Sequence, residues 1–220
     1  MTLRPLSPLV LVLAACSACG DDGTMTADAA PPDPCAPQMT FTGELVDWDS
    51  GSSGFLGIFS ANFTLRSNPT FTDMTAPNGR FEMCIPSMDG LVDVTPVSGS
   101  GYVSGVVVVS RAVLASQPLQ SYRSFKDLRA QDFGFSPSLA QVYVHVHGAA
   151  RTVTASAVPG SMHRFDGTAW AAGNTGNDIY LANVPVMSQT NLVVTGGAVT
   201  GPTTIPLSAG AFTYVTLVAN

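Results

Sequence analysis

The sequence predicts an all-β fold of two small transthyretin-like or immunoglobulin-like β-sandwiches in tandem, which follow a signal peptide and a disordered tether. Three observations support it. Charged residues make up only 11% of the 220 residues, less than half the usual share. The 21 glycines and 16 prolines suit many tight turns. Short runs of alternating apolar and polar residues recur at the spacing of sandwich strands and disfavour long helices.

Residues 1–15 have the layout of a secretory signal peptide. Arg4 precedes an apolar run at 9–13, which is far shorter than the roughly 20 residues needed to cross a membrane. Residues 13–16 read Leu-Ala-Ala-Cys, which resembles the lipobox of bacterial lipoproteins. The resemblance implies that Cys16 becomes the first mature residue and carries acyl chains. It also implies that Ser17 directs the chain to the outer membrane of a Gram-negative cell. The expected partner is therefore the membrane, through this lipid.

Residues 16–38 are predicted to form a disordered tether. Most of this stretch is rich in Asp, Ala, Thr and Pro, and it cannot bury enough apolar surface to offset the entropy of ordering. Cys16 and Cys19 have the C-x-x-C spacing of redox motifs. They lie at the cleavage site, away from any βαβ pattern, so we interpret them as part of the anchor region.

The body divides into a first module at 39–110, a connector at 111–138 and a second module at 139–220. Strands are expected at 40–47, 62–65, 71–74, 80–85, 91–97 and 102–109, then at 142–146, 152–158, 177–185, 191–195 and 211–218. Pro77, Asn78 and Gly79 form a turn signal. In the connector, helical turns are expected at 112–117 and 122–131, bounded by Pro118 and Pro137 and packed across the first module.

The first module resembles carboxypeptidase regulatory-like domains, which are transthyretin-like sandwiches of seven strands. The similarity begins with Thr-Gly-Glu-Leu-Val-Asp at 42–47. It continues with the threonine segment 72–75, the Asn-Gly-Arg-Phe turn at 78–81, Cys-Ile-Pro at 84–86 and Gly-Tyr at 101–102. The chain departs from the family pattern between residues 50 and 59. The resemblance implies a β-sandwich for about a third of the chain.

The second half repeats this plan weakly. Residues 177–185 match residues 78–86, because each nonamer runs from a turn through an apolar strand to a proline. This similarity indicates a duplicated domain, and chance similarity between β-rich stretches is the alternative. If it is a true repeat, the second module has its own core and folds alone. Its expected core residues are Val144, Val153, Ile179, Leu181, Val193 and Tyr214.

Two histidines form a candidate metal site. His145 and His147 flank Val146 on an expected strand, so both rings point to one face, and His163 could add a third ligand. The alternative is that Tyr143, His145 and His147 form the solvent face of a strand whose valines form the core. We favour this alternative because no cysteine or acidic ligand accompanies the histidines at metal-site spacing.

Two tryptophans form a candidate carbohydrate site. Trp48 and Trp170 could stack on sugar rings if they are exposed, and the alternative is burial at a sandwich edge. The neighbouring Asp-Trp-Asp-Ser-Gly at 47–51 fails the EF-hand calcium pattern, because Gly51 stands fifth and Ile58 twelfth.

The motifs give no support for catalysis, a cofactor or nucleic-acid binding. The sequence has neither a Gly-x-Ser-x-Gly elbow nor a His-Glu-x-x-His motif. The glycine-rich segment 99–105 misses the dinucleotide spacing by one residue. Nine basic residues and a net charge of −6 leave no basic stripe, so a nucleic-acid partner is not expected. We therefore expect a chain that is not an enzyme and needs no cofactor.

Two cysteines remain once lipid occupies Cys16 and the tether holds Cys19. Cys35 precedes the first strand, and Cys84 lies on a central strand next to the turn. Export places both where disulfides form and persist, so we predict a Cys35–Cys84 disulfide. The alternative is a free buried Cys84 with an unpaired Cys35, because pairing does not follow from sequence alone.

These features favour a non-catalytic, lipid-anchored protein of the cell envelope that serves as a structural or protein-interaction module. A carbohydrate-binding lipoprotein, with a polysaccharide as partner, is the first alternative. A hydrolase whose site matches no motif is the second.

Overall fold

The structure is a computed structural model that describes residues 35–51, 54–86, 88–126 and 131–220. Its strands up to the middle of the chain are β1 (Met39–Asp47), β2 (Asn62–Leu65), β3 (Thr72–Met74), β4 (Arg80–Ile85), β5 (Gly90–Thr95), β6 (Gly105–Val109) and β7 (Leu119–Ser124). A short helix, α1 (Arg111–Ser116), precedes β7, and a 3-10 turn at Gln131–Phe133 follows it.

The second half is also built of strands. They are β8 (Ala140–His147), β9 (Arg151–Ala155), β10 (Ser161–Phe165), β11 (Trp170–Ala172), β12 (Thr175–Gly176), β13 (Asp178–Val184), β14 (Gln189–Thr195), β15 (Val199–Thr200), β16 (Thr204–Pro206) and β17 (Phe212–Ala219). The all-β fold class predicted from the sequence is confirmed.

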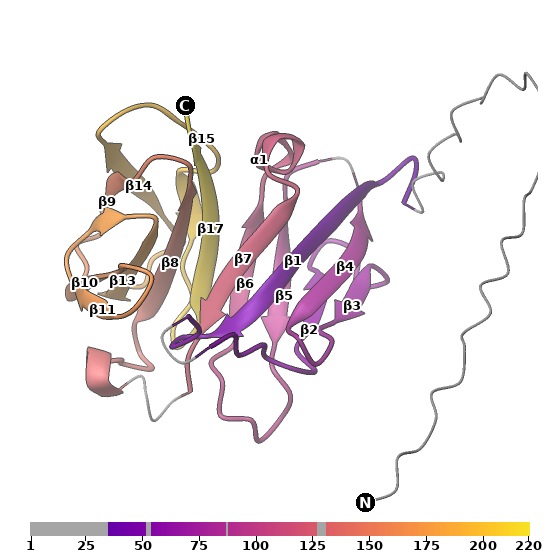
Figure 1. The fold of residues 1–220 in the computed structure, drawn as a ribbon, viewed down its shortest axis with the longest axis horizontal. Helices are drawn as coiled ribbons and strands as arrows, with labels where there is room; N and C mark the ends of the chain where they lie inside the picture. The colour runs from indigo at the N-terminus through magenta and orange to yellow at the C-terminus, as the bar shows by residue number, and fades with distance from the viewer. Residues whose placement is uncertain (1–34, 52–53, 87, 127–130) are drawn as a thin grey trace, which may run out of the picture. The chain divides into compact units, whose positions relative to one another are not determined.

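A large sheet contains strands from both halves of the chain. Its order is β11-β10-β13-β8-β17-β6-β5-β2-β3, with β15 attached to β17. The last strand, β17, lies between β8 and β6 and pairs in parallel with both (Figure 1). Two smaller sheets, β4-β1-β7 and β12-β9-β14-β16, complete the fold. The described residues form one compact unit.

The large sheet has an apolar cluster on each face. On β17, Phe212 and Tyr214 belong to a cluster shared with β1, β4 and β7, whereas Val215 and Leu217 belong to a cluster shared with β9 and β14. Strand β8 alternates in the same way, with Tyr143 in the first cluster and Val144 in the second. The central strands are therefore buried on both faces, and β-branched and aromatic residues fill both kinds of position.

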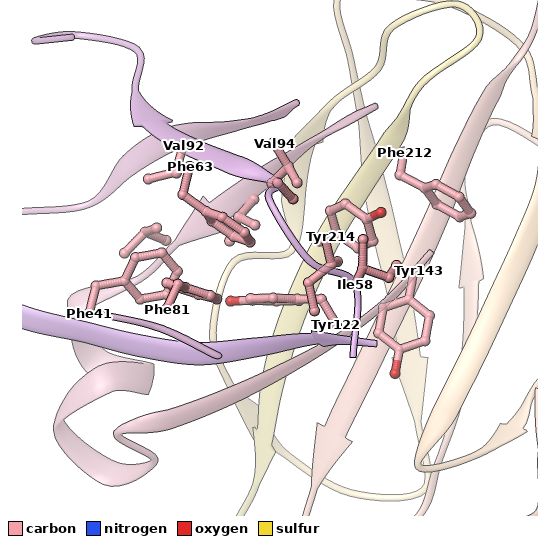
Figure 2. Packing of buried hydrophobic residues seen from close by; sticks show 14 of the residues in the cluster. Phe41, Ile58, Phe63, Phe81, Val92, Val94, Tyr122, Tyr143, Phe212 and Tyr214 are labelled. Carbon is pink, nitrogen blue, oxygen red and sulfur yellow. The ribbon is translucent and has the colours of Figure 1, made fainter. Parts of the chain in front are cut away.

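The first cluster is rich in aromatic rings. Figure 2 shows Phe41, Phe81 and Tyr122 in a row beneath Phe63, with Tyr214 and Tyr143 beyond them. Phe63 stacks on Phe81 at 3.8 Å between ring centroids, and Phe41 meets Phe81 edge-on at 5.0 Å. These rings join the small β4-β1-β7 sheet to the large sheet.

The structure corrects the first part of the expected helical turn at 122–131, whereas residues 127–130 of that turn lie outside the described residues. Residues up to Ser124 belong to β7, which pairs in parallel with β1. Every second side chain of this strand points inward, but two of them, Gln120 and Ser124, are polar. The Ser124 hydroxyl is satisfied by the Val103 carbonyl, at 3.2 Å. The strand was not predicted from the sequence because strand prediction relies on apolar residues at every second position, and here two of the inward positions are polar.

The expected core of the second half is partly correct. Val144, Val153, Ile179 and Leu181 are buried together in the cluster shared by β8, β9, β13 and β17. Val193 is 46% exposed, so its expected burial is wrong. Tyr214 is buried in the cluster of the first half instead. The division into a first module at 39–110 and a second at 139–220 stays a prediction. Strands of both modules lie in one sheet.

Candidate functional site

The predicted disulfide is present at the start of the described chain. Cys35 and Cys84 are bonded, with their Cα atoms 5.2 Å apart. The antiparallel pairing of β1 with β4 places Thr40 opposite Cys84, and the turn in which Gln38 donates to the Cys35 carbonyl returns Cys35 to this point. The bond closes a loop with a sequence separation of 49, for which the chain-entropy estimate is about 4 kcal/mol. The expected lipidation site, Cys16, lies outside the described residues.

The two tryptophans stack on each other. Trp48, which follows β1, and Trp170, on β11, lie 3.8 Å apart between centroids at an interplanar angle of 5°. The Trp170 indole N–H donates to the Trp48 carbonyl at 3.0 Å. Trp48 is fully buried, as the alternative of burial predicted. A sugar ring would have to displace Trp170 to reach Trp48, so Trp48 cannot serve as the aromatic platform of the carbohydrate hypothesis, whereas Trp170 itself is partly exposed.

The histidines do not gather into a metal site. His147 is exposed at the end of β8, and the His145 imidazole is bonded to Asp178 on β13, with Nδ1 2.8 Å from Oδ1. His163 lies on β10, where its Nε2 is 3.0 Å from the Ser161 hydroxyl and its ring meets Phe133 edge-on. Within the described ranges, no group of three or more His, Cys, Asp or Glu side chains could hold a metal ion.

The expected solvent face of β8 is also corrected. Tyr143 is fully buried, whereas His145 is partly exposed and His147 exposed. The reason is that β8 is covered on both faces over most of its length, since β7 lies close to β8 and the rings of Trp48 and Tyr214 pack against Tyr143. Only the end of the strand reaches water.

A polar cluster that sequence reasoning missed surrounds Asp178. Its Oδ1 accepts hydrogen bonds from the Tyr143 hydroxyl and from His145. Burial would raise the pKa of Asp178, but the hydrogen bonds from His145 and Tyr143 and the nearby charge of Arg123 outweigh burial and lower it. Burial and the Asp178 charge raise the pKa of the Tyr143 hydroxyl well above its usual range. Asp178 is thus held as a carboxylate.

Arg123 connects this cluster to the first half of the chain. Its guanidinium donates to the Ser50 carbonyl and lies over the Phe165 ring, 4.3 Å from the centroid. Among the described hydrogen bonds, none joins His145 to a serine, threonine or cysteine that could act as a nucleophile. We interpret the cluster as a charged contact between β7, β8, β10 and β13. His145 and Asp178 are 33 residues apart, so no local spacing could have revealed it.

An open groove lies where β3 approaches β4. It has a volume of about 530 Å³ and is lined by Thr42, Gly43, Asp73, Met74, Ala76, Arg80, Phe81, Glu82 and Leu119. Asp73 accepts a hydrogen bond from the Glu82 backbone N–H at 2.6 Å. The Asp73 carboxylate thus binds the Glu82 N–H on the free edge of β4. This N–H cannot then pair with a strand of another chain.

Comparisons with known proteins give no family. No protein-family model matches the chain, and no curated protein matches it. Among solved structures, the chain is similar to the shaft pilin SpaA from Lactobacillus rhamnosus GG, with 8% identity and a TM-score of 0.29 over 83% of this chain and 98% of that one. It is also similar to the Bacillus anthracis TIE protein, with 9% identity and a TM-score of 0.24 over 82% of this chain and 34% of that one.

Proposed function

We propose that this chain is a lipid-anchored protein of the cell envelope, whose β-sheet unit is a non-catalytic structural or protein-interaction module. Leu-Ala-Ala-Cys at 13–16, after a short apolar run, supplies the signal for acylation of Cys16. Two or more acyl chains on one residue hold a protein stably on a membrane. The outer membrane is the proposed location, from Ser17.

The Cys35–Cys84 disulfide is the observation that carries this proposal. Disulfides persist in exported proteins and are rare in reducing compartments. The disulfide supports export independently of the lipobox, because it follows from the pairing of β1 with β4. No helix in the described part of the chain is long and apolar enough to cross a membrane.

The form of the described unit suits a scaffold. Edge strands β3, β11, β12 and β16 have only two or three residues each, and short edges limit unspecific strand pairing. The Asp178 cluster serves packing between strands. A rigid, covalently closed β-unit at the end of a tether can present fixed surfaces to a partner in the envelope.

Metabolic labelling with a clickable palmitate analogue tests the anchor. We expect the full chain to be labelled in its own cell and Cys16→Ser to lose the label and accumulate as precursor, because the thioether cannot form. Cys19→Ser is the matched control, since it removes a neighbouring cysteine and should keep the label. Undiminished labelling of Cys16→Ser would contradict the proposal.

A further inference from the structure

The open groove where β3 approaches β4 is lined by side chains of two kinds. Met74 on β3 and Leu119 on β7 both line it, and they are 52% and 46% exposed. The acidic residues Asp73 and Glu82 line it as well. Its volume of about 530 Å³ can hold several side chains of a ligand. The groove therefore suits a ligand that carries both an apolar and a charged group.

Strand pairing fixes the positions of these groups. Thr42 on β1 lies opposite Glu82 on one side and Leu119 on the other, so the three residues form a row across the small sheet. Thr42 is half-buried and the other two are exposed, so this row lies on the outer face. Asp73 reaches the same place from β3, because its carboxylate accepts the Glu82 backbone N–H. The groove is thus built by the pairing of the strands.

The charge around the groove favours a cation. Asp73 and Glu82 are held close together by the hydrogen bond between them, and none of the described ion pairs includes either residue. Arg80 also lines the groove, but Glu44 lies directly opposite it on β1 and offsets its charge. Two neighbouring carboxylates repel each other, and a positive group between them turns this repulsion into attraction. The net charge of −6 adds to the attraction for a cation and repels a second copy of this chain.

We propose that the groove binds a protein segment in which a lysine or arginine stands next to an apolar residue. The basic side chain lies between Asp73 and Glu82, and the apolar side chain packs against Met74 and Leu119. A small polyamine would neutralise the carboxylates but leave the two apolar side chains in water. The inference rests on the proposed function, because it names the chemistry of the partner that an interaction module in the envelope binds.

Fluorescence anisotropy with defined peptides tests the groove. The probe is a labelled ten-residue peptide with Leu-Arg-Leu at its centre and Gly and Ser on both sides, and the comparison peptide has Leu-Glu-Leu instead. The full chain, purified in a non-ionic detergent, is titrated into each peptide. The arginine peptide should bind about tenfold more tightly than the glutamate peptide, and added salt should weaken its binding.

Matched variants locate the binding. Glu82→Gln and Asp73→Asn should each weaken it several-fold, and Asp73→Asn keeps a side-chain oxygen for the Glu82 N–H. Asp166→Asn is the control, because it removes the same charge from an exposed loop outside the groove. Met74→Ser should also weaken binding. Met88→Ser should not, since Met88 is 62% exposed but does not line the groove.

Three results would overturn the proposal. One is equal binding of the two peptides. Another is a loss in Asp166→Asn as large as in Glu82→Gln, which would reduce the binding to attraction by the net charge. The third is displacement of the arginine peptide by spermidine as effectively as by unlabelled peptide, which would assign the groove to a small cation. Palmitate labelling is independent of this measurement. A labelled chain that fails to bind overturns only the groove, and an unlabelled chain that binds overturns only the anchor.

Discussion

At the scale of single residues, the fold depends on close contacts that admit no larger side chain. Gly79 is the clearest case. It has φ of +77°, and a Cβ on it would lie 2.3 Å from the Leu45 carbonyl oxygen and 2.9 Å from the Gly57 Cα. The Asn78-Gly79 turn signal in the sequence thus corresponds to a backbone approach between the turn after β3 and the end of β1.

Gly79→Ala should destabilise the protein strongly. A left-handed conformation costs a non-glycine residue about 1–2 kcal/mol, and the contact with backbone atoms adds to this. Gly99→Ala is the matched control, because Gly99 has φ of +81° and nothing within 4 Å of an added Cβ. Chemical denaturation of both variants measures the difference. Equal losses of unfolding free energy would show that the contact at Gly79 has no cost.

A second residue-scale prediction concerns pH. Burial lowers the pKa of His163 below the usual histidine value of 6.5. The neutral imidazole is favoured in the folded state, so stability is complete above about pH 6.5 and falls as the pH decreases, because the unfolded chain then binds more protons. Asp178, whose pKa is also lowered, adds acid sensitivity only at lower pH.

Thermal unfolding at pH values between 7 and 5 should therefore show a falling melting temperature. His163→Gln should reduce this dependence, whereas His147→Gln, at an exposed position, should leave it unchanged. An unchanged slope in His163→Gln would exclude His163 as its source.

At the scale of elements, strands with apolar side chains on every second position were predicted most accurately. Strand β4 was predicted with its observed bounds, because buried Phe81, Met83 and Ile85 alternate with exposed or half-exposed residues. Strands β10, β11 and β12 were missed because they are short or their residues are mostly polar and partly exposed. The contact around Asp178 was also beyond prediction, since it depends on how distant strands pair.

The β8–β13 pair contains a buried polar link. The side-chain carbonyl of Gln141 accepts hydrogen bonds from the Tyr180 hydroxyl at 2.7 Å and from the Asn183 backbone N–H at 3.0 Å. Asn183 lies at the irregularity of this pairing, with φ of 56°. The link fixes the register where β13 departs from regular pairing.

Gln141→Leu should cost about 1–3 kcal/mol, because it leaves the buried Tyr180 hydroxyl without its acceptor. Tyr180→Phe in the same chain should recover part of this loss. A double-mutant cycle by urea denaturation measures the coupling. Strictly additive effects of the two substitutions would contradict the link.

At the scale of the whole molecule, both halves contribute to one core. Tyr143, Tyr180, Phe212 and Tyr214 of the second half are buried among rings of the first half. The sequence predicts that residues 139–220 fold as an autonomous module. Because their strands share a sheet with the first half, we expect instead that this segment does not fold alone. Expressed alone, that segment would expose these four aromatic side chains and lose the pairing of β17 with β6.

The stacked Trp48–Trp170 pair reports directly on the junction of the halves, since each indole comes from a different half. Indoles stacked in contact couple their excited states, and a twist between their transition dipoles gives an exciton couplet in the circular dichroism spectrum. Trp170→Phe identifies this signal by removing it. Heating the full chain while recording the couplet and the far-ultraviolet β signal tests whether the halves unfold together. A single folding unit predicts that both signals disappear in one coincident transition. Loss of the couplet in an earlier, separate transition, with the β signal retained, would contradict it.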